Sequence, residues 1–218
     1  MKLKESPQIN YSTTSDPTEA RKWLESLPSL IACDFEAASR FTAEEKEAFK
    51  AELKENPPFA RERELRQFIN SSGLSHPSLV TITHLSIAYT ENDAYVFIVD
   101  SKEMLTLIID FLVTTTSKQI WHNLCFDGKL IYYHSKGLFP KNYEDTQIFA
   151  KTLLNHVNNT KSQTGLKHLM GYKYGDWAVS TDYFDISQMY NPDVHRYAAI
   201  DACATLTLWN ELDAYTKD

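Results

Sequence analysis

Short apolar runs alternate with amphipathic stretches along this chain, a pattern typical of a protein that mixes strands and helices. Residues 79–90 and 94–100 are rich in β-branched and aromatic side chains and flank a short polar connection. Two such runs predict a β-hairpin. The apolar run over residues 29–36 ends in an acid, a phenylalanine and an acid. It predicts a buried strand that emerges at one edge of a sheet.

Helical segments separate these strands. The last one carries alanines and leucines at the 3.6-residue spacing of a helix. A short apolar strand through Ile120 and Trp121 precedes a helix expected to begin near Phe126, and another short strand is expected near Tyr143. The other predicted helices cover residues 17–27, 102–114, 146–155, 164–170 and 193–215. This order predicts an α/β fold in which a mixed β-sheet is flanked by helices on both faces.

Residues 42–70 depart from this pattern. Between residues 44 and 66, 13 of 23 residues are charged, six of them basic and seven acidic. Thr42 and Glu45 form a capping box, and two short helices that meet at the prolines of residues 57–58 are expected. The prediction is a charged helical insertion after the strand over residues 29–36. A flap beside a functional site and a solvated decoration are both open interpretations.

Composition sets the limits of these interpretations. The chain has 218 residues, of which 43% are hydrophobic and 12% aromatic, and this predicts a single domain over residues 1–218. No apolar stretch reaches the length of a membrane span and the first residues lack the apolar core of a signal peptide, so no membrane partner and a cytoplasmic location are expected. A net charge of −7 argues against a broad basic surface for duplex DNA, but not against a short single strand held at one end.

Acidic side chains at three places carry the candidate chemistry. Asp34 and Glu36 point to the same face of their strand, because side chains alternate along a strand. Two like charges near a core are costly unless a cation joins them. Tyr197 and Asp201 are four residues apart and share one helix face, and Asp127 is expected in the first turn of its helix. Each alone is compatible with a solvated strand end, a helix-terminal acid or a packing pair; together they predict a shared site.

The order Asp34-x-Glu36, then Asn123-x-x-Phe126-Asp127, then Tyr197-x-x-x-Asp201 resembles the DEDDy group of 3′-to-5′ exonucleases. It is similar to the proofreading domain of A-family DNA polymerases. The stretches EDTQIFAKTLL and TGLKHLMGYKYG also fit that family, and the resemblance runs from residue 31 to residue 209. It implies an RNase H-like fold for the predicted mixed sheet.

The resemblance implies a role for each acid. Asp34, Glu36 and Asp201 would hold the ion that activates the attacking water, and Asp127 would support a second ion. Oxygen ligands of this kind suit Mg²⁺ or Mn²⁺, with two ions in the site, better than zinc. Tyr197 would orient or deprotonate the nucleophile. The ordinary pKa of a phenol, near 10, favours the orienting role.

The resemblance also implies residues beside the substrate: Phe35, Ala37, Asn123 and Phe126. Asn123 is equally compatible with a plain turn residue, and both phenylalanines with core packing. Further candidates for base stacking are Tyr132, Tyr133 and Tyr183. Candidates for phosphate contact are Lys129, Lys167 and Arg196.

Other residues near the predicted ligands are given structural roles. Cys33, Cys125 and Cys203 form no CxxC pair and are interpreted as small buried hydrophobes rather than zinc ligands. Asp145 is interpreted as a strand-end or helix-cap acid.

The function implied by the resemblance is a metal-dependent 3′-to-5′ exonuclease that acts on single-stranded or frayed DNA ends and releases nucleoside 5′-monophosphates. An RNA-trimming enzyme of the same fold and a non-catalytic module that binds nucleic acid or protein are the alternatives. The expected partners are the 3′ end of single-stranded DNA or RNA and, in trans, a DNA polymerase or another replication protein.

Overall fold

The computed structural model describes residues 8–40, 80–153, 163–177 and 185–217, together with a few isolated positions between residues 44 and 77. Most of the predicted insertion over residues 42–70, with its capping box and its two expected helices, lies outside the described residues. Tyr183 lies outside them as well.

Six strands form one mixed sheet. They are β1 (Asn10–Thr14), β2 (Leu30–Ser39), β3 (Val80–Ala88), β4 (Asp93–Ile98), β5 (Lys118–Trp121) and β6 (Tyr143–Asp145). Their order is β1-β4-β3-β2-β5-β6. β3 pairs antiparallel with both β2 and β4, whereas the β1–β4, β2–β5 and β5–β6 pairs are parallel. The predicted hairpin is confirmed as β3 and β4.

The edge strand β1 was not predicted. Its sequence is Asn-Tyr-Ser-Thr-Thr, and only Thr14 is buried. A polar strand at a sheet edge leaves no alternation of apolar and polar residues from which it could be recognised. Parallel pairing with β4 places it at the edge of the sheet.

The α-helices follow the predicted order, and the 3₁₀ turn before the last helix was not predicted. The helical elements are α1 (Pro17–Glu25), α4 (Lys102–Thr114), α5 (Leu124–His134), α6 (Thr146–Leu153), α7 (Leu166–Tyr174), the 3₁₀ turn η3 (Ile186–Gln188) and α8 (Pro192–Tyr215). α4 has its predicted bounds. α5 begins at Leu124 rather than near Phe126, and α7 continues past Met170 to Tyr174. At three α-helix starts the N-cap residue's own side chain accepts a hydrogen bond from a first-turn amide: Asp16 before α1, Ser101 before α4 and Asn191 before α8.

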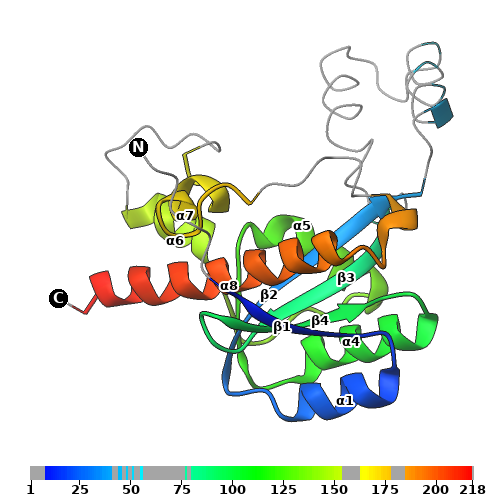
Figure 1. Ribbon diagram of the computed structural model, residues 1–218, viewed down its shortest axis with the longest axis horizontal. Coiled ribbons are helices and arrows are strands. Elements are labelled where there is room, and N and C mark those ends of the chain that lie inside the picture. Colours follow the sequence, from blue (N-terminus) through cyan, green and yellow to red (C-terminus); the bar gives the residue numbers. More distant parts are fainter. Residues whose placement is uncertain are drawn as a thin grey trace.

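Helices cover both faces of the sheet, as predicted. Figure 1 shows α8 running along one face, with α1 and α4 on the other. The α8 face is closed by small side chains, among them Ala198 and Ala202 of the helix and Ala32 of β2. The opposite face packs larger side chains of α1, α4 and α5. Alanines let the long helix approach the sheet closely, so polar side chains of α8 and β2 can meet.

The alternation along β2 divides its residues between these two layers. Cys33 and Phe35 pack in the core under α1 and α4, while Ala32 packs against α8. Asp34 and Glu36 therefore share the α8 face, as the period of a strand predicted. Among the residues the structure describes, no helix is long and apolar enough to cross a membrane.

Candidate active site

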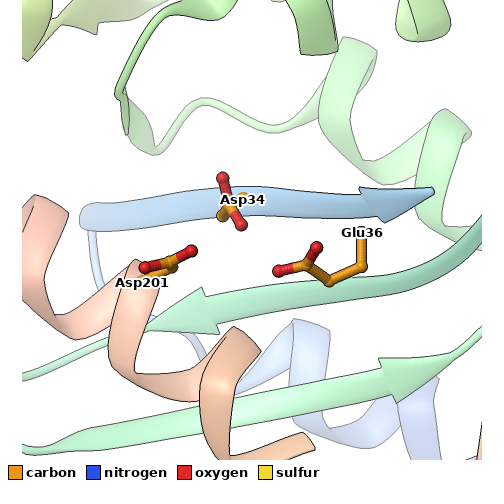
Figure 2. Close-up of side chains that lie close together, drawn as sticks. All are labelled: Asp34, Glu36 and Asp201. Atoms are coloured by element: carbon orange, nitrogen blue, oxygen red, sulfur yellow. The ribbon is translucent and has the colours of Figure 1, made fainter. Parts of the chain in front are cut away.

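Three of the four predicted acids meet between β2 and α8. Asp34, Glu36 and Asp201 each offer a carboxylate oxygen, and these oxygens all lie within 4.8 Å of one another. Figure 2 shows Glu36 directed back along β2 toward the other two carboxylates. Glu36 and Asp201 are 7% and 6% exposed. Glu36 and Asp201, 165 positions apart in sequence, thus lie close together. We call Asp34, Glu36 and Asp201 the acidic cluster.

Strand β3 holds the backbone of the two strand acids. The hydroxyl of Ser86 donates to the carbonyl oxygen of Asp34 (3.3 Å), and that of Thr83 donates to the carbonyl oxygen of Glu36 (3.1 Å). The register between β2 and β3 shifts between Glu36 and Ala37. A bulge at this point re-aims the side chains that follow it. Both acids therefore precede the register shift and lie on the same face of β2.

Burial and repulsion define the electrostatics of the acidic cluster. Burial raises the pKa of Asp34 well above its ordinary value, and the charge of Glu36 adds to this effect. Burial likewise raises the pKa of Glu36, followed by the charge of Asp201. The ammonium of Lys167 lowers both pKa values in part. Without a further cation, the folded protein therefore carries an unfavourable concentration of negative charge.

The acidic cluster fits a divalent cation. Glu36 Oε1 is buried and has no hydrogen-bond partner among the described residues. A buried carboxylate oxygen of this kind is costly unless a positive partner satisfies it. Hard cations such as Mg²⁺ prefer oxygen ligands, and all three residues of the acidic cluster provide them. The donor set and the unsatisfied oxygen together indicate a metal site rather than a chance gathering of acids.

Asp127, the fourth predicted acid, lies beside the acidic cluster but is not part of it. It occupies the first turn of α5, as predicted. Its Oδ1 accepts a hydrogen bond from the backbone N–H of Phe35 (3.2 Å). Burial raises the pKa of Asp127 to about 7, and this hydrogen bond opposes the rise. The charge of Asp127 also contributes to the raised pKa of Asp34, which places it within electrostatic reach of the site.

The Lys167 side chain contacts the two site residues that α8 contributes, Tyr197 and Asp201. Its Nζ donates to Tyr197 Oη at 2.8 Å and lies 3.4 Å from each carboxylate oxygen of Asp201. It also lies over the Tyr197 ring, 4.5 Å from the ring centre. Lys167 was predicted only as a candidate for phosphate contact. The structure adds a contact to two of the proposed catalytic residues.

Trp177 is the site residue that the sequence did not reveal. Its indole Nε1 donates to Asp201 Oδ1 at 2.6 Å, and its ring lies 5.4 Å from Lys167 Nζ. A tryptophan after a glycine and an aspartate shows no pattern that points to a carboxylate 24 residues later. Only the packing of the segment that follows α7 against α8 brings the two together. Trp177 and Lys167 hold Asp201 from two sides.

Tyr197 keeps its proton at neutral pH. Burial raises the pKa of its hydroxyl far above the ordinary value, and the charges of Asp201, Glu36 and Asp34 add to the rise. Its oxygen accepts from Lys167, and a side-chain hydrogen bond to Asp201 also contributes to the raised pKa. The geometry therefore supports the orienting role over that of a general base.

The residues expected beside the substrate lie in different surroundings. The Phe35 side chain is 4% exposed and faces the core, 5.8 Å from the Trp121 ring, so core packing accounts for it. Ala37 and Phe126 are partly buried against the same core. Asn123 adopts the left-handed conformation (φ 62°, ψ 49°) just before α5 and makes no side-chain cap. That conformation is the one that asparagine tolerates in turns.

Asp145 has the structural role that was predicted. Its carboxylate accepts hydrogen bonds from the backbone N–H groups of Asn123 and Leu124 and from those of Gln147 and Ile148. It thereby caps the starts of α5 and α6 together. This contact fixes the start of the helix that carries Asp127.

The cysteine prediction is correct for two residues and wrong for one. Cys33 and Cys203 are buried, but Cys125 is exposed. Cys125 lies at the beginning of α5, on the side of the helix away from Asp127, and that face does not pack against the sheet. Neither histidine near the motifs, His122 or His195, joins the acidic cluster.

The chain shares its fold with several solved structures, and in this chain two acids lie on β2 of the mixed sheet and a third on α8. The chain is similar to the solved structure of Trypanosoma brucei RNase D in complex with RNA U12, with 16% identity and a TM-score of 0.61 over 96% of this chain and 63% of that one. It is also similar to the catalytic core of RRP6 from Trypanosoma brucei (13% identity, TM-score 0.60, 96% of this chain and 49% of that one).

A third similar structure is Brucella melitensis NrnC with bound Mg²⁺ (13% identity, TM-score 0.51, 96% of this chain and 81% of that one). No protein-family model and no curated protein matches the sequence. At these identities the likeness establishes the RNase H-like fold, and function is argued from the site.

Proposed function

We propose that this protein is a metal-dependent 3′-to-5′ exonuclease that shortens single-stranded nucleic acid from its 3′ end and releases nucleoside 5′-monophosphates. The observation that carries the proposal is the acidic cluster with its unsatisfied buried oxygen, Glu36 Oε1. Its place on a fold shared with RNase D, RRP6 and NrnC supports the proposal.

Different acids would hold the two metal ions. Asp34, Glu36 and Asp201 would bind Mg²⁺ or Mn²⁺, and Asp127, at the margin of the acidic cluster, would support a second ion. When two such ions are bound, they activate water and stabilise both the attacking and the leaving oxygen of a phosphodiester. The presence of Mg²⁺ in the NrnC structure supports the choice of metal.

Two side chains of the protein would act on the attacking water and the phosphate. Tyr197 would donate its retained proton to an oxygen in the site and so orient the nucleophile. Lys167, whose side chain is 40% exposed, would hold the Tyr197 hydroxyl in place and offer its charge to the substrate phosphate. Trp177 would keep Asp201 in position through the 2.6 Å hydrogen bond.

RNA is the substrate that the similar structures favour, in place of the DNA end that the sequence analysis preferred. The RNase D structure contains RNA U12 and another contains GMP, and one NrnC structure contains pGG. The DNA polymerase partner expected from the sequence has no support from these structures, and we do not propose it.

The decisive experiment compares RNA and DNA oligonucleotides of one sequence, labelled at the 5′ end, with Mg²⁺, with Mn²⁺ and with a chelator. We expect a ladder of products that shorten one nucleotide at a time, with RNA degraded faster and with no reaction in chelator. A matched oligonucleotide with a blocked 3′ end should remain intact. Internal cleavage of the blocked strand, or no shortening of either free strand, would contradict the proposal.

Lys167→Met tests the role of the lysine. The substitution keeps most of the side-chain volume but removes the cation beside Asp201. Because this ion pair is partly exposed, we expect a loss of about 1 kcal/mol, which lowers the melting temperature of the metal-free protein by about 2–4 °C. The difference should shrink in excess Mg²⁺, and the rate should fall about tenfold as the tyrosine loses its support.

Lys173→Met is the matched control. Lys173 also pairs with an acid, Glu91, at 3.1 Å, but that acid is not part of the acidic cluster. A melting temperature that responds to Mg²⁺ in the same way in both variants would show that Lys167 has no special relation to the metal site.

A further inference from the structure

Exposed aromatic side chains gather on the outer side of α5. Of the ten large hydrophobic side chains that the described residues expose, six lie between residues 132 and 148. Five of them line one groove of about 840 Å³: Tyr132, Tyr133, Phe139, Tyr143 and Ile148. We call it the α5 groove. Its volume lies within the range of sites that bind small organic groups.

The turn after α5 builds one wall of the α5 groove. Lys136 and Gly137 have positive φ angles of 60° and 106°, so the chain reverses there. The Ser135 hydroxyl donates to the carbonyl oxygen of Leu138 (2.8 Å) and accepts from its N–H (2.9 Å). This turn brings Phe139 back over Gly128, where an added Cβ would lie 2.8 Å from the ring. The backbone geometry of this turn therefore sets the position of the Phe139 ring.

The charge of the α5 groove is positive, although the chain carries −7 overall. Among the described residues that line it, Lys129 and Lys136 are basic and Asp145 is the one acid. The Asp145 carboxylate is already occupied by the backbone amides of two helix starts. Exposed rings between cations are the combination that binds single-stranded nucleic acid, because bases stack on the rings and phosphates meet the lysines.

The α5 groove does not overlap the proposed active site, because the two lie on different sides of α5. Asp127 points from α5 toward β2, where it accepts from Phe35. At about 100° per residue, Cys125, Lys129 and Tyr132 lie about 140° to 160° away from Asp127 around the helix. Leu124, at the start of α5, lines the α5 groove three residues before Asp127. The two sites are therefore separated by about the 10 Å width of one helix.

We propose that the α5 groove binds the bases of single-stranded nucleic acid upstream of the nucleotide being removed. The inference rests on the proposed function, since it assigns the groove to the same strand. At a rise of about 3.4 Å per nucleotide, a helix width corresponds to roughly three nucleotides. The α5 groove should therefore act on oligonucleotides and not on dinucleotides.

The first test measures binding of a fluorescent 12-nucleotide oligoadenylate in the presence of chelator. The variant Tyr132→Ala/Tyr143→Ala removes two exposed rings, which are 58% and 44% exposed. Loss of a stacked base weakens binding by about tenfold per ring. The control is Tyr215→Ala, at the far end of α8 and 80% exposed. We expect weaker binding of the 12-mer by the double variant and unchanged binding by the control, with unchanged melting temperatures for both.

The second test separates charge from stacking. Binding of single strands depends on salt with a slope of about −0.7 for each phosphate neutralised. Lys129→Ala/Lys136→Ala should therefore make the salt dependence of 12-mer binding shallower by about 1.4. An unchanged slope would overturn the assignment of these lysines to phosphate.

Hydrolysis distinguishes failure of the inference from failure of the proposed function. We expect kcat/KM to fall in the tyrosine double variant for the 12-mer but not for a dinucleotide. An equal loss for both substrates, or wild-type binding of the 12-mer, would overturn the upstream groove. A change from dimer to monomer in light scattering with wild-type binding would assign the α5 groove to a subunit interface instead. Ring-dependent binding without any hydrolysis would leave the α5 groove in place and refute the nuclease.

Discussion

Replacing Asp34 with asparagine is expected to abolish hydrolysis and to stabilise the metal-free protein. Asparagine preserves the shape of the side chain but removes one of the three negative charges that meet within 4.8 Å. Loss of a metal ligand at the reacting centre costs several kcal/mol of transition-state stabilisation, so the rate should fall by about a thousandfold or more. Relief of the repulsion that raises the pKa of Asp34 and Glu36 should raise the melting temperature in chelator.

Tyr197→Phe separates the effect on metal binding from the effect on the rate of hydrolysis. The tyrosine contacts Lys167 and lies beside the acidic cluster, but its hydroxyl keeps its proton and is not a ligand candidate. We expect this variant to retain Mg²⁺-induced stabilisation while its rate falls by about a hundredfold. Calorimetric titration with Mg²⁺ and single-turnover hydrolysis measure the two effects separately. An Asp34→Asn protein that retains a tenth of the activity would exclude the proposed metal site.

The stability of the metal-free protein is expected to fall as the pH rises from about 4 to about 7. Burial raises the folded-state pKa of Asp34 and Glu36, and raises that of Asp127 to about 7. A carboxyl group whose pKa is higher in the folded than in the unfolded protein binds its proton more tightly when folded. Its contribution therefore favours folding at low pH and is lost as the pH rises through the folded pKa.

Metal should reverse this trend. Divalent ions bind the deprotonated acids, so the stabilisation by Mg²⁺ should grow with pH. An ion present at a hundredfold excess over its dissociation constant stabilises the folded state by about 2.7 kcal/mol, or about 5–10 °C for a chain of this size. Melting temperatures measured in chelator and in excess Mg²⁺ across this pH range provide the test.

Other carboxylates also make stability depend on pH, so this test requires a control. Hydrogen bonds lower the pKa of Glu91 and Asp93, so these groups contribute stability that is lost as the pH falls. The difference between the wild type and Asp34→Asn/Asp201→Asn removes this background, because Glu91 and Asp93 are unchanged in both. If the two proteins showed the same pH profile in chelator, the acidic cluster would not be the source of the effect.

The local geometry of the candidate site was predictable from the sequence. The two-residue period of a strand places Asp34 and Glu36 on one face, and the four-residue spacing in α8 places Tyr197 and Asp201 on another. The position of Asp127 in the first turn of α5 followed from the apolar strand before it. These predictions depend on backbone periodicity, which neighbouring residues determine and which tertiary packing changes little.

The sequence by itself determined the order of the elements apart from β1 and η3, the two-sided sheet and the faces that carry the acids. Tertiary structure alone decided that Lys167 and Trp177 hold Asp201, that Asp127 is held by the backbone of Phe35, and that four aromatic rings meet outside α5. Each of these contacts joins different elements, separated by 92 residues in the case of Asp127 and Phe35. Side-chain periodicity carries no information about which faces of distant elements meet, because that depends on how the helices and strands pack together.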